Sequence, residues 1–325
     1  MRRTLTLLAK AIISVLLLYF SLRWVDISTF TARLHALEPG WLIFAVFLLI
    51  VQTALLAARW QQITLACGAS LGFGSALQIS FIAAFFNQVL PSTVGGDGAR
   101  IWVLARHGAG WAVAVYSVLI DRIIGVFILA LIAVLCLPWT LQLIHEPTAR
   151  AALFVIAFGA LAAPLGFLLI GTRFQQWFDR RAITRHLSAA SRAAGALCRS
   201  RRSLNIVIVC SIAIHLLTIA AAWGCTKAVA APVSFAQILF LLPPVLLVAT
   251  VPISIAGWGV RESTMIVAFA YSGLAQSDGL TLSILFGAAY FFLGILGGIV
   301  WIISGLRMEA LKRAVADAGS ATGAP

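Results

Sequence analysis

The chain has 325 residues, of which 62% are hydrophobic and only 10% are charged, and its mean hydropathy is +1.04. This composition is typical of an all-α polytopic integral membrane protein, and no segment is long enough to form a soluble catalytic domain. The formal net charge is +13, but the basic residues gather in a few loops. That distribution indicates contact with anionic lipid and argues against nucleic-acid binding.

Six apolar stretches are long enough to cross a bilayer as helices. In chain order they are Leu5–Trp24, Trp41–Ala58, Val113–Leu137, Ala151–Gly171, Leu204–Trp223 and Leu280–Leu306. Trp41 and Trp60 stand at positions that suit interfacial aromatic anchors. We therefore expect one transmembrane domain over residues 1–306 and a cytoplasmic tail over residues 307–325.

Two further apolar stretches, residues 75–106 and 235–272, carry proline and glycine breaks that a lipid-exposed helix does not tolerate. The second stretch is interrupted at Pro243-Pro244 and again at VPISIAGWGVRE, residues 251–262. That motif aligns without gaps with LPSTVGGDGARI, residues 90–101. The identical pairs are Pro91 with Pro252, Gly96 with Gly257, Gly98 with Gly259 and Arg100 with Arg261.

The basic residues also predict an orientation. They concentrate at the N-terminus, in residues 172–203 and in the tail, so both termini and this segment are expected on the cytoplasmic side. Between two segments on the same side of the membrane, the chain must cross the membrane an even number of times. The six predicted spans already satisfy this count, with four before residues 172–203 and two after them. Each broken stretch is therefore expected to enter and leave on one face as a re-entrant hairpin, the first from the cytoplasm and the second from outside. Related hairpins from opposite faces predict an inverted repeat, as in secondary transporters. If the hairpins span instead, the chain makes about eight helical passes.

Residues 172–203 also have an amphipathic pattern. Aromatic residues at helical spacing precede a run of arginines, which predicts a helix lying on the anionic inner leaflet. The residues concerned are Phe174, Trp177, Phe178, Arg180, Arg181 and Arg185. The alternative is an ordinary cytoplasmic segment packed against the helix bundle.

Three acids and three arginines fall within the predicted membrane depth, namely Asp97, Arg100, Asp121, Arg122, Arg261 and Glu262. Each costs about 2.5–3.5 kcal/mol at a helix centre unless it is paired. Either they are static ion pairs that hold the broken helices, or the arginines and the glycine amides form a polar pocket for an anionic headgroup. The candidate substrate-binding residues are these six with Asn87, Ser92, Gly95, Gly96, Ser254, Gly257 and Gly259.

Metal and cofactor chemistry has no support in the sequence. The five cysteines form no CxxC motif, and the five histidines show no ligand spacing. The loop Gly95–Gly98 lacks the lysine of a P-loop. We predict no cofactor and favour a transporter over an enzyme.

Three ordered motifs together carry a resemblance to a known family. They are Asn87 with Leu90-Pro91-Ser92, Gly95-Gly96-Asp97 and Arg100; then Asp121-Arg122; then Pro252-Ile253-Ser254 with Gly257 to Glu262. The chain resembles the flippase-like transmembrane region of bacterial lysylphosphatidylglycerol synthases and their stand-alone relatives, some of which are associated with hopanoid or glycolipid pathways. The resemblance covers roughly residues 5–306. It implies a multi-pass protein of the bacterial inner membrane that handles lipids.

Three functions stay open from the sequence. The first is a phospholipid translocase, or flippase, that binds an anionic or modified headgroup in a midplane cavity and moves the lipid between leaflets. The second is a membrane-embedded lipid or glycolipid transferase with Asp97 or Glu262 as base. The third is an accessory subunit of a lipid-modifying enzyme. The expected partners are membrane lipids and such an enzyme, and the sequence does not give the oligomeric state.

Overall fold

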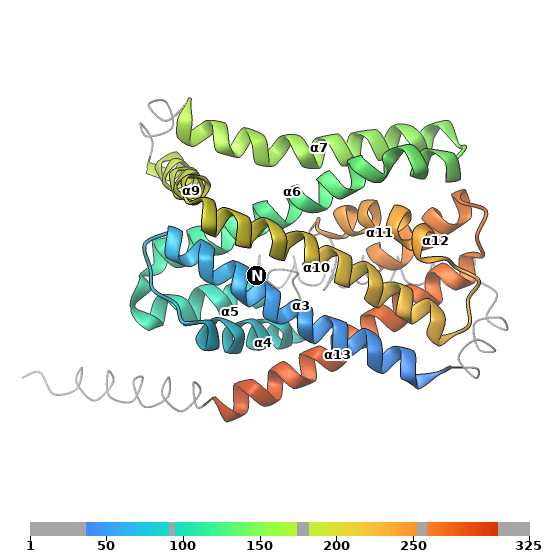
Figure 1. Ribbon diagram of the computed structural model, residues 1–325, viewed down its shortest axis with the longest axis horizontal. Helices are drawn as coiled ribbons and strands as arrows, with labels where there is room; N and C mark the ends of the chain where they lie inside the picture. Colours follow the sequence, from blue (N-terminus) through green and yellow to red (C-terminus); the bar gives the residue numbers. More distant parts are fainter. Residues whose placement is uncertain (1–36, 91–94, 174–181, 252–258, 305–325) are drawn as a thin grey trace, which may run out of the picture.

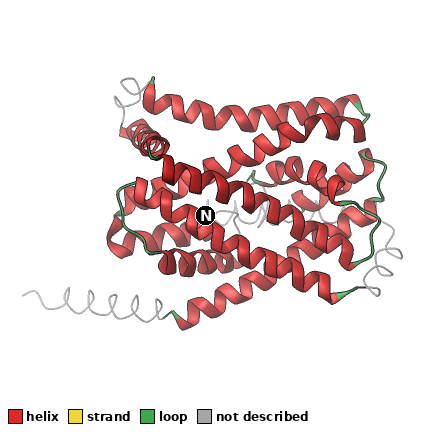
Figure 2. Cartoon of the chain, in the orientation of Figure 1, coloured by secondary structure: helices red, strands yellow, loops and turns green. Residues whose placement is uncertain are grey.

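The computed structural model describes residues 37–90, 95–173, 182–251 and 259–304, and every regular element in these ranges is a helix (Figure 2). Five helices are long and apolar enough to cross a membrane. They are α3 (Pro39–Ala66), α6 (Trp111–Leu143), α7 (Pro147–Thr172), α10 (Arg201–Ala228) and α13 (Gln276–Ile303). The predicted all-α polytopic class is confirmed. The predicted span Leu5–Trp24 and the tail lie outside the described residues.

Both broken stretches form pairs of short helices. The first consists of α4 (Phe73–Val89), α5 (Gly95–Leu104) and a π-helical turn η1 (Ala105–Ala109), and the second of α11 (Phe235–Ala249) and α12 (Val260–Tyr271). The two helices of each pair contact each other. In Figure 1, α4 and α5 enter from the end of the bundle where α3 ends, whereas α11 and α12 enter from the opposite end. These are two hairpins of opposite orientation, as predicted.

The helix contacts repeat between the two halves of the chain. If α3, α4, α5 and α6 are matched with α10, α11, α12 and α13, each contact in one half has its counterpart in the other. Helix α4 packs on α13 and α11 packs on α6, while α3 packs directly on α10. Helices α5 and α6 likewise contact each other, as do α12 and α13. This exchange of partners is what an inverted repeat predicts.

Glycines let α13 approach α4 closely. A side chain at Gly297 would collide with the carbonyl oxygen of Phe81, and a Cβ at Gly298 would lie 2.9 Å from the ring of Phe85. Small residues at such a crossing allow membrane helices to gain van der Waals contact that lipid does not offer. The first hairpin therefore packs tightly against α13, the last helix in the described residues.

Helix α11 runs without a break through Pro243 and Pro244, so the interruption predicted there is wrong. Proline at 244 removes the N–H that would bond the carbonyl of Phe240. The hydroxyl of Thr140, on α6, shares its single proton between that carbonyl, at 3.2 Å, and the carbonyl of Cys136, at 3.1 Å. A neighbouring helix thus satisfies the freed acceptor, which is how membrane helices tolerate proline.

The basic segment between α7 and α10 contains helix α9 (Ala182–Arg199), which lies across the end of the bundle at which the first hairpin enters (Figure 1). Its buried residues Ala190, Ala194 and Leu197 pack in one cluster with Ile63 of α3 and Phe167 of α7. Residues 174–181, which carry most of the predicted amphipathic pattern, lie outside the described residues. The described part of this segment is packed against the bundle.

Candidate functional site

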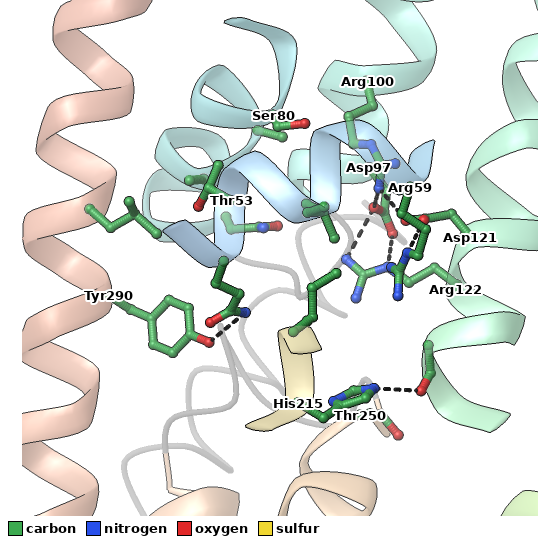
Figure 3. A pocket seen from close by; sticks show the side chains of 18 of the residues that line it. Thr53, Arg59, Ser80, Asp97, Arg100, Asp121, Arg122, His215, Thr250 and Tyr290 are labelled. Atoms are coloured by element: carbon green, nitrogen blue, oxygen red, sulfur yellow. Dashed lines mark hydrogen bonds and ion pairs between the residues drawn. The ribbon is translucent and has the colours of Figure 1, made fainter. Parts of the chain in front are cut away.

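A cavity of about 290 Å³ is lined by helices from both halves of the chain (Figure 3). Helices α3, α4, α5, α6, α10 and α13 line it, together with Thr250 at the end of α11. Its polar and charged lining residues are Gln52, Thr53, Arg59, Ser80, Asn87, Gln88, Asp97, Arg100, Asp121, Arg122, His215, Thr250 and Tyr290.

Three arginines and two aspartates form one network at the cavity wall. The Asp121 carboxylate accepts from Nε of Arg59 at 2.8 Å and from Nη1 of Arg100 at 2.9 Å. The Asp97 carboxylate accepts from Nε of Arg122 at 2.6 Å and Nη2 at 3.0 Å. Arg100 also lies 3.6 Å from Asp97, which joins the two pairs. Helices α3, α5 and α6 are linked by charges that would be costly alone in a membrane.

Arg100 is buried but incompletely bonded. Its side chain is 4% accessible, and its Nε and Nη2 atoms are shielded from solvent without a hydrogen-bond partner among the described residues. The guanidinium lies 4.2 Å from the ring centroid of Trp60, a cation–π contact, and Trp60 donates its Nε1 proton to Ser117. Trp60 is fully buried, so its predicted role as an interfacial anchor is wrong. An aromatic ring supports the cation from one side and leaves its donors for another partner.

The start of α5 depends on close contact with α4. The amide N–H of Gly96 donates to the side-chain oxygen of Asn87 at 2.8 Å. A Cβ at Gly95 would lie 2.7 Å from the carbonyl oxygen of Phe86, and one at Gly96 would collide with the carbonyl oxygen of Ala83. Asp97 occupies the first turn of α5, where the helix dipole favours a carboxylate. The glycines and Asn87 therefore place Asp97 and Arg100 at the cavity.

Arg59 belongs to this network but was not among the predicted site residues. Arg59 is the first residue beyond the predicted span Trp41–Ala58. In the structure α3 continues to Ala66, and Arg59 is 4% exposed. Its Nη1 also donates to Ser211 of α10 at 3.3 Å. Gln52, Leu56 and Arg59 lie on one face of α3, but no sequence pattern distinguished that face.

The second hairpin carries a separate polar cluster. Arg261 donates to Ser283 of α13 at 2.9 Å and to Glu262 at 2.7 Å. Glu262 also accepts from the N–H of Gly259 at 2.6 Å and from Ser283 at 2.9 Å. Arg261 reaches a residue 22 positions later, as Arg100 reaches Asp121 21 positions later. The two clusters thus occupy equivalent places in the two halves.

The predicted site residues are therefore divided between two places. The cavity brings together Asn87, Asp97, Arg100, Asp121 and Arg122, whereas Gly259, Arg261 and Glu262 do not line it. Gly95 and Gly96 support it from behind, at the α4–α5 contact. Ser92, Ser254 and Gly257 lie outside the described residues.

The cavity wall opposite the arginines carries no charge. Figure 3 shows Thr53 and Tyr290 across the cavity from Arg100, with His215 and Thr250 below. Tyr290 accepts a long hydrogen bond of 3.5 Å from Gln52, whose Oε1 is buried without a partner. His215 contacts the carbonyl of Gly125 at 3.0 Å. Within the described ranges, no three His, Cys, Asp or Glu residues gather as metal ligands.

Fold and site together define a class: a polytopic helical membrane protein with two opposed hairpins and a charged cavity lined by helices from both halves of the chain. The chain matches the family described as Lysylphosphatidylglycerol synthase TM region over residues 7–298, and it belongs to that family. No curated protein and no solved structure matches the chain. The family membership relates this protein to lipid modification or lipid flipping in a membrane.

Proposed function

We propose that this protein is a lipid translocase of the bacterial inner membrane. The lipid headgroup enters the central cavity while its acyl chains stay in the bilayer, and rocking of the two halves exposes the cavity to either leaflet. The observation that carries the proposal is the cavity itself, which is lined by three arginines and by helices from both halves of the chain, in a protein with five helices long and apolar enough to cross a membrane. The guanidinium group of an arginine can donate two parallel hydrogen bonds to the oxygens of a phosphate group.

The charge distribution supports an orientation for this translocase. Arg185, Arg192 and Arg199 lie on α9, and Arg201 and Arg202 begin α10, at the end where the first hairpin enters. By the excess of arginine, this end faces the cytoplasm. The first hairpin then opens toward the cytoplasm and the second toward the outside.

Bonding of the carboxylates favours translocation over group transfer. A transferase needs a carboxylate that is free to accept a proton from its substrate. Asp97 is held by two bonds from Arg122, and Glu262 is held by Arg261, Ser283 and the Gly259 amide. These bonds occupy both oxygens of each carboxylate, which a general base would need for the proton of its substrate. A translocase leaves its lipid chemically unchanged.

The test is transport by the purified protein in proteoliposomes that contain fluorescent phospholipids. We expect lipid exchange between leaflets with wild type and a loss of roughly tenfold or more with Arg122→Gln, since a charge-assisted hydrogen bond contributes about 1.5–3 kcal/mol. Arg106→Gln is the matched control, because Arg106 is exposed, does not line the cavity and lies over the Trp102 ring. Chemical conversion of a lipid by the pure protein, or equal transport by both variants, contradicts the proposal.

A further inference from the structure

Helix α9 carries its charge on the side opposite its packing face. Arg185, Arg192 and Arg199 follow one another at intervals of seven residues, so they share one side of the helix, and all three are exposed. Its buried residues Ala190 and Ala194 pack in one cluster with α3, α6, α7 and α10. Arg192 is two residues past Ala190, which is about 200° around the helix axis. One side of α9 is therefore apolar and faces the bundle, and the other is basic.

The depth of α9 places it at the level of the lipid headgroups. Its packing cluster includes Phe167, five residues before the end of α7, and Val207, six residues after the start of α10. At 1.5 Å per residue these partners lie about 7.5 and 9 Å inside the ends of their helices. Because a helix is about 10 Å across, α9 lies beside the ends of the spans, where the interfacial region of a bilayer begins (Figure 1).

An exposed tryptophan lies at the same end of the bundle. Trp111, the first residue of α6, is 62% exposed. Tyr116, five residues later on α6, is in hydrogen-bond contact with His186 of α9 at 2.6 Å. Tryptophan is enriched where membrane proteins meet the headgroup region. The surroundings of α9 thus indicate a neighbouring lipid surface.

The helices that form this end carry no acid that balances their arginines. The sequence contains no Asp or Glu at residues 180–261, while Arg201 and Arg202, at the start of α10, are also exposed. Arg192 donates to Ser188 at 2.8 Å, a bond that leaves its positive charge in place. Clusters of four to eight basic residues directly cytoplasmic of a membrane span attract anionic lipid. A layer of negative headgroups complements such a surface.

We propose that α9 and the first turn of α10 form a docking surface for anionic phospholipid headgroups, separate from the central cavity. This basic surface consists of Arg185, Arg192, Arg199, Arg201 and Arg202. Their guanidinium groups bind phosphate oxygens of the leaflet at this end. Because α9 contacts α3, α6, α7 and α10, bound lipid stabilises the packing of four spans. Membrane contact and packing against the bundle are then two sides of one helix, whether or not the protein moves lipid.

The first experiment measures which lipid surrounds α9. A fluorophore is attached to Cys198, which is exposed and next to Arg199, in the full-length chain reconstituted in equal parts of phosphatidylcholine and phosphatidylserine. A trace of one lipid or the other carries a spin label that quenches the fluorophore on contact. We expect spin-labelled phosphatidylserine to quench several-fold more. The difference should shrink at about 1 M salt, where the Debye length is about 3 Å. Cys198→Ser is the labelling blank.

Substitutions on the basic surface supply the second experiment. In the variant Arg185→Gln/Arg192→Gln/Arg199→Gln the preference for phosphatidylserine should fall close to one, because each arginine near a lipid surface contributes about fivefold. Lys227→Gln removes a charge at the far end of α10 and should keep the wild-type preference. Phosphatidylserine should also raise the melting temperature of wild type and Lys227→Gln, but not that of the triple variant.

Three results would overturn the proposal. Equal quenching by both lipids in the wild type leaves the basic surface to an acidic soluble partner. A preference that survives in the folded triple variant means that anionic lipid is held elsewhere on the chain. If the triple variant does not fold, Arg199→Gln serves alone, and an unchanged preference there contradicts the proposal too. None of these measurements uses lipid transport, so loss of the translocase proposal leaves the docking surface standing, and the reverse also holds.

Discussion

At the residue scale, the bonding of Asp121 explains how two buried arginines are tolerated. One carboxylate accepts from Arg59 on α3 and Arg100 on α5, and Asp121 itself is 1% exposed on α6. Three helices that are distant in sequence therefore meet at one anion. Arg122 is the next residue, yet its side chain is 50% accessible and bonds Asp97 instead. Two neighbours in the motif thus have different environments.

This difference predicts different costs of substitution. Asp121→Ala leaves Arg59 buried without its counter-ion and Arg100 with only its longer contact to Asp97, at 3.6 Å, and breaking a buried pair costs about 3–5 kcal/mol. Arg122→Ala removes a more accessible side chain and should cost clearly less. Thermal unfolding in detergent, followed by size-exclusion chromatography, compares the two variants. Equal melting temperatures would mean that the Asp121 network does not hold the helices together.

Cysteine reactivity gives a second prediction at this scale. Burial raises the pKa of the Cys67 thiol to about 11, so at pH 7.5 nearly all of it is the unreactive thiol form. Cys198 is exposed at the end of α9. Maleimide should therefore modify Cys198 quickly and Cys67 slowly, and Cys67 should gain reactivity only as the pH approaches 11. Mass spectrometry of the labelled peptides, with Cys198→Ser as the control, measures both rates.

At the element scale, the first hairpin depends on the absence of side chains where its two helices meet. A Cβ at Gly96 would lie 2.7 Å from the Asn87 side-chain oxygen and would collide with Ala83. Gly98 is two residues further along α5, and a Cβ there would meet no atom within 4 Å. The same helix therefore contains one glycine required by packing and one that packing does not require.

We expect Gly96→Ala to separate α4 from α5 and to lower both stability and lipid transport. Gly98→Ala should be neutral or stabilising by up to about 1 kcal/mol, since alanine favours a helix over glycine. Melting temperature and transport rate of the two variants, made in parallel, test this pair. If Gly98→Ala were the more damaging variant, the described contact between α4 and α5 would not control the hairpin.

At the scale of the whole molecule, the two halves have equivalent contacts but different polar clusters. The first half builds an accessible cavity around Arg100, and the second binds Arg261 to Glu262 and Ser283. In transporters with inverted repeats, the two halves exchange conformations between inward-facing and outward-facing states. The translocase proposed above would use such a cycle, and the asymmetry lies between its two polar clusters.

The orientation of the whole chain can be tested at Cys198, which lies at the same end as the first hairpin. Excess arginine at this end predicts that it faces the cytoplasm. A membrane-impermeant maleimide should label Cys198 in inside-out vesicles and leave it unlabelled in intact spheroplasts. Labelling from outside the cell would reverse the assignment of the two hairpins to the membrane faces.

Much of this arrangement follows from the sequence alone. Apolar length determines the spans α3, α6, α7, α10 and α13, because a helix needs about 20 apolar residues to cross a bilayer. The two aligned proline–glycine–arginine motifs and the even number of crossings between basic segments predict two opposed hairpins. The reason is that lipid disfavours backbone groups without hydrogen bonds, while basic residues stay on the cytoplasmic side. These constraints act on each segment separately, so the spans and hairpins can be predicted from the sequence without knowing which helices contact each other.

The partners of each buried charge were decided only by tertiary structure. Motif similarity suggested that Arg100 and Arg261 share one pocket, but packing places Arg100 at the cavity with Asp121 and ties Arg261 to Ser283. Arg59 joined the site because α3 extends past its apolar core, and helix α11 passes Pro244 because Thr140 reaches its free carbonyl. Contacts between distant helices depend on side-chain packing across the bundle, which one-dimensional spacing does not contain.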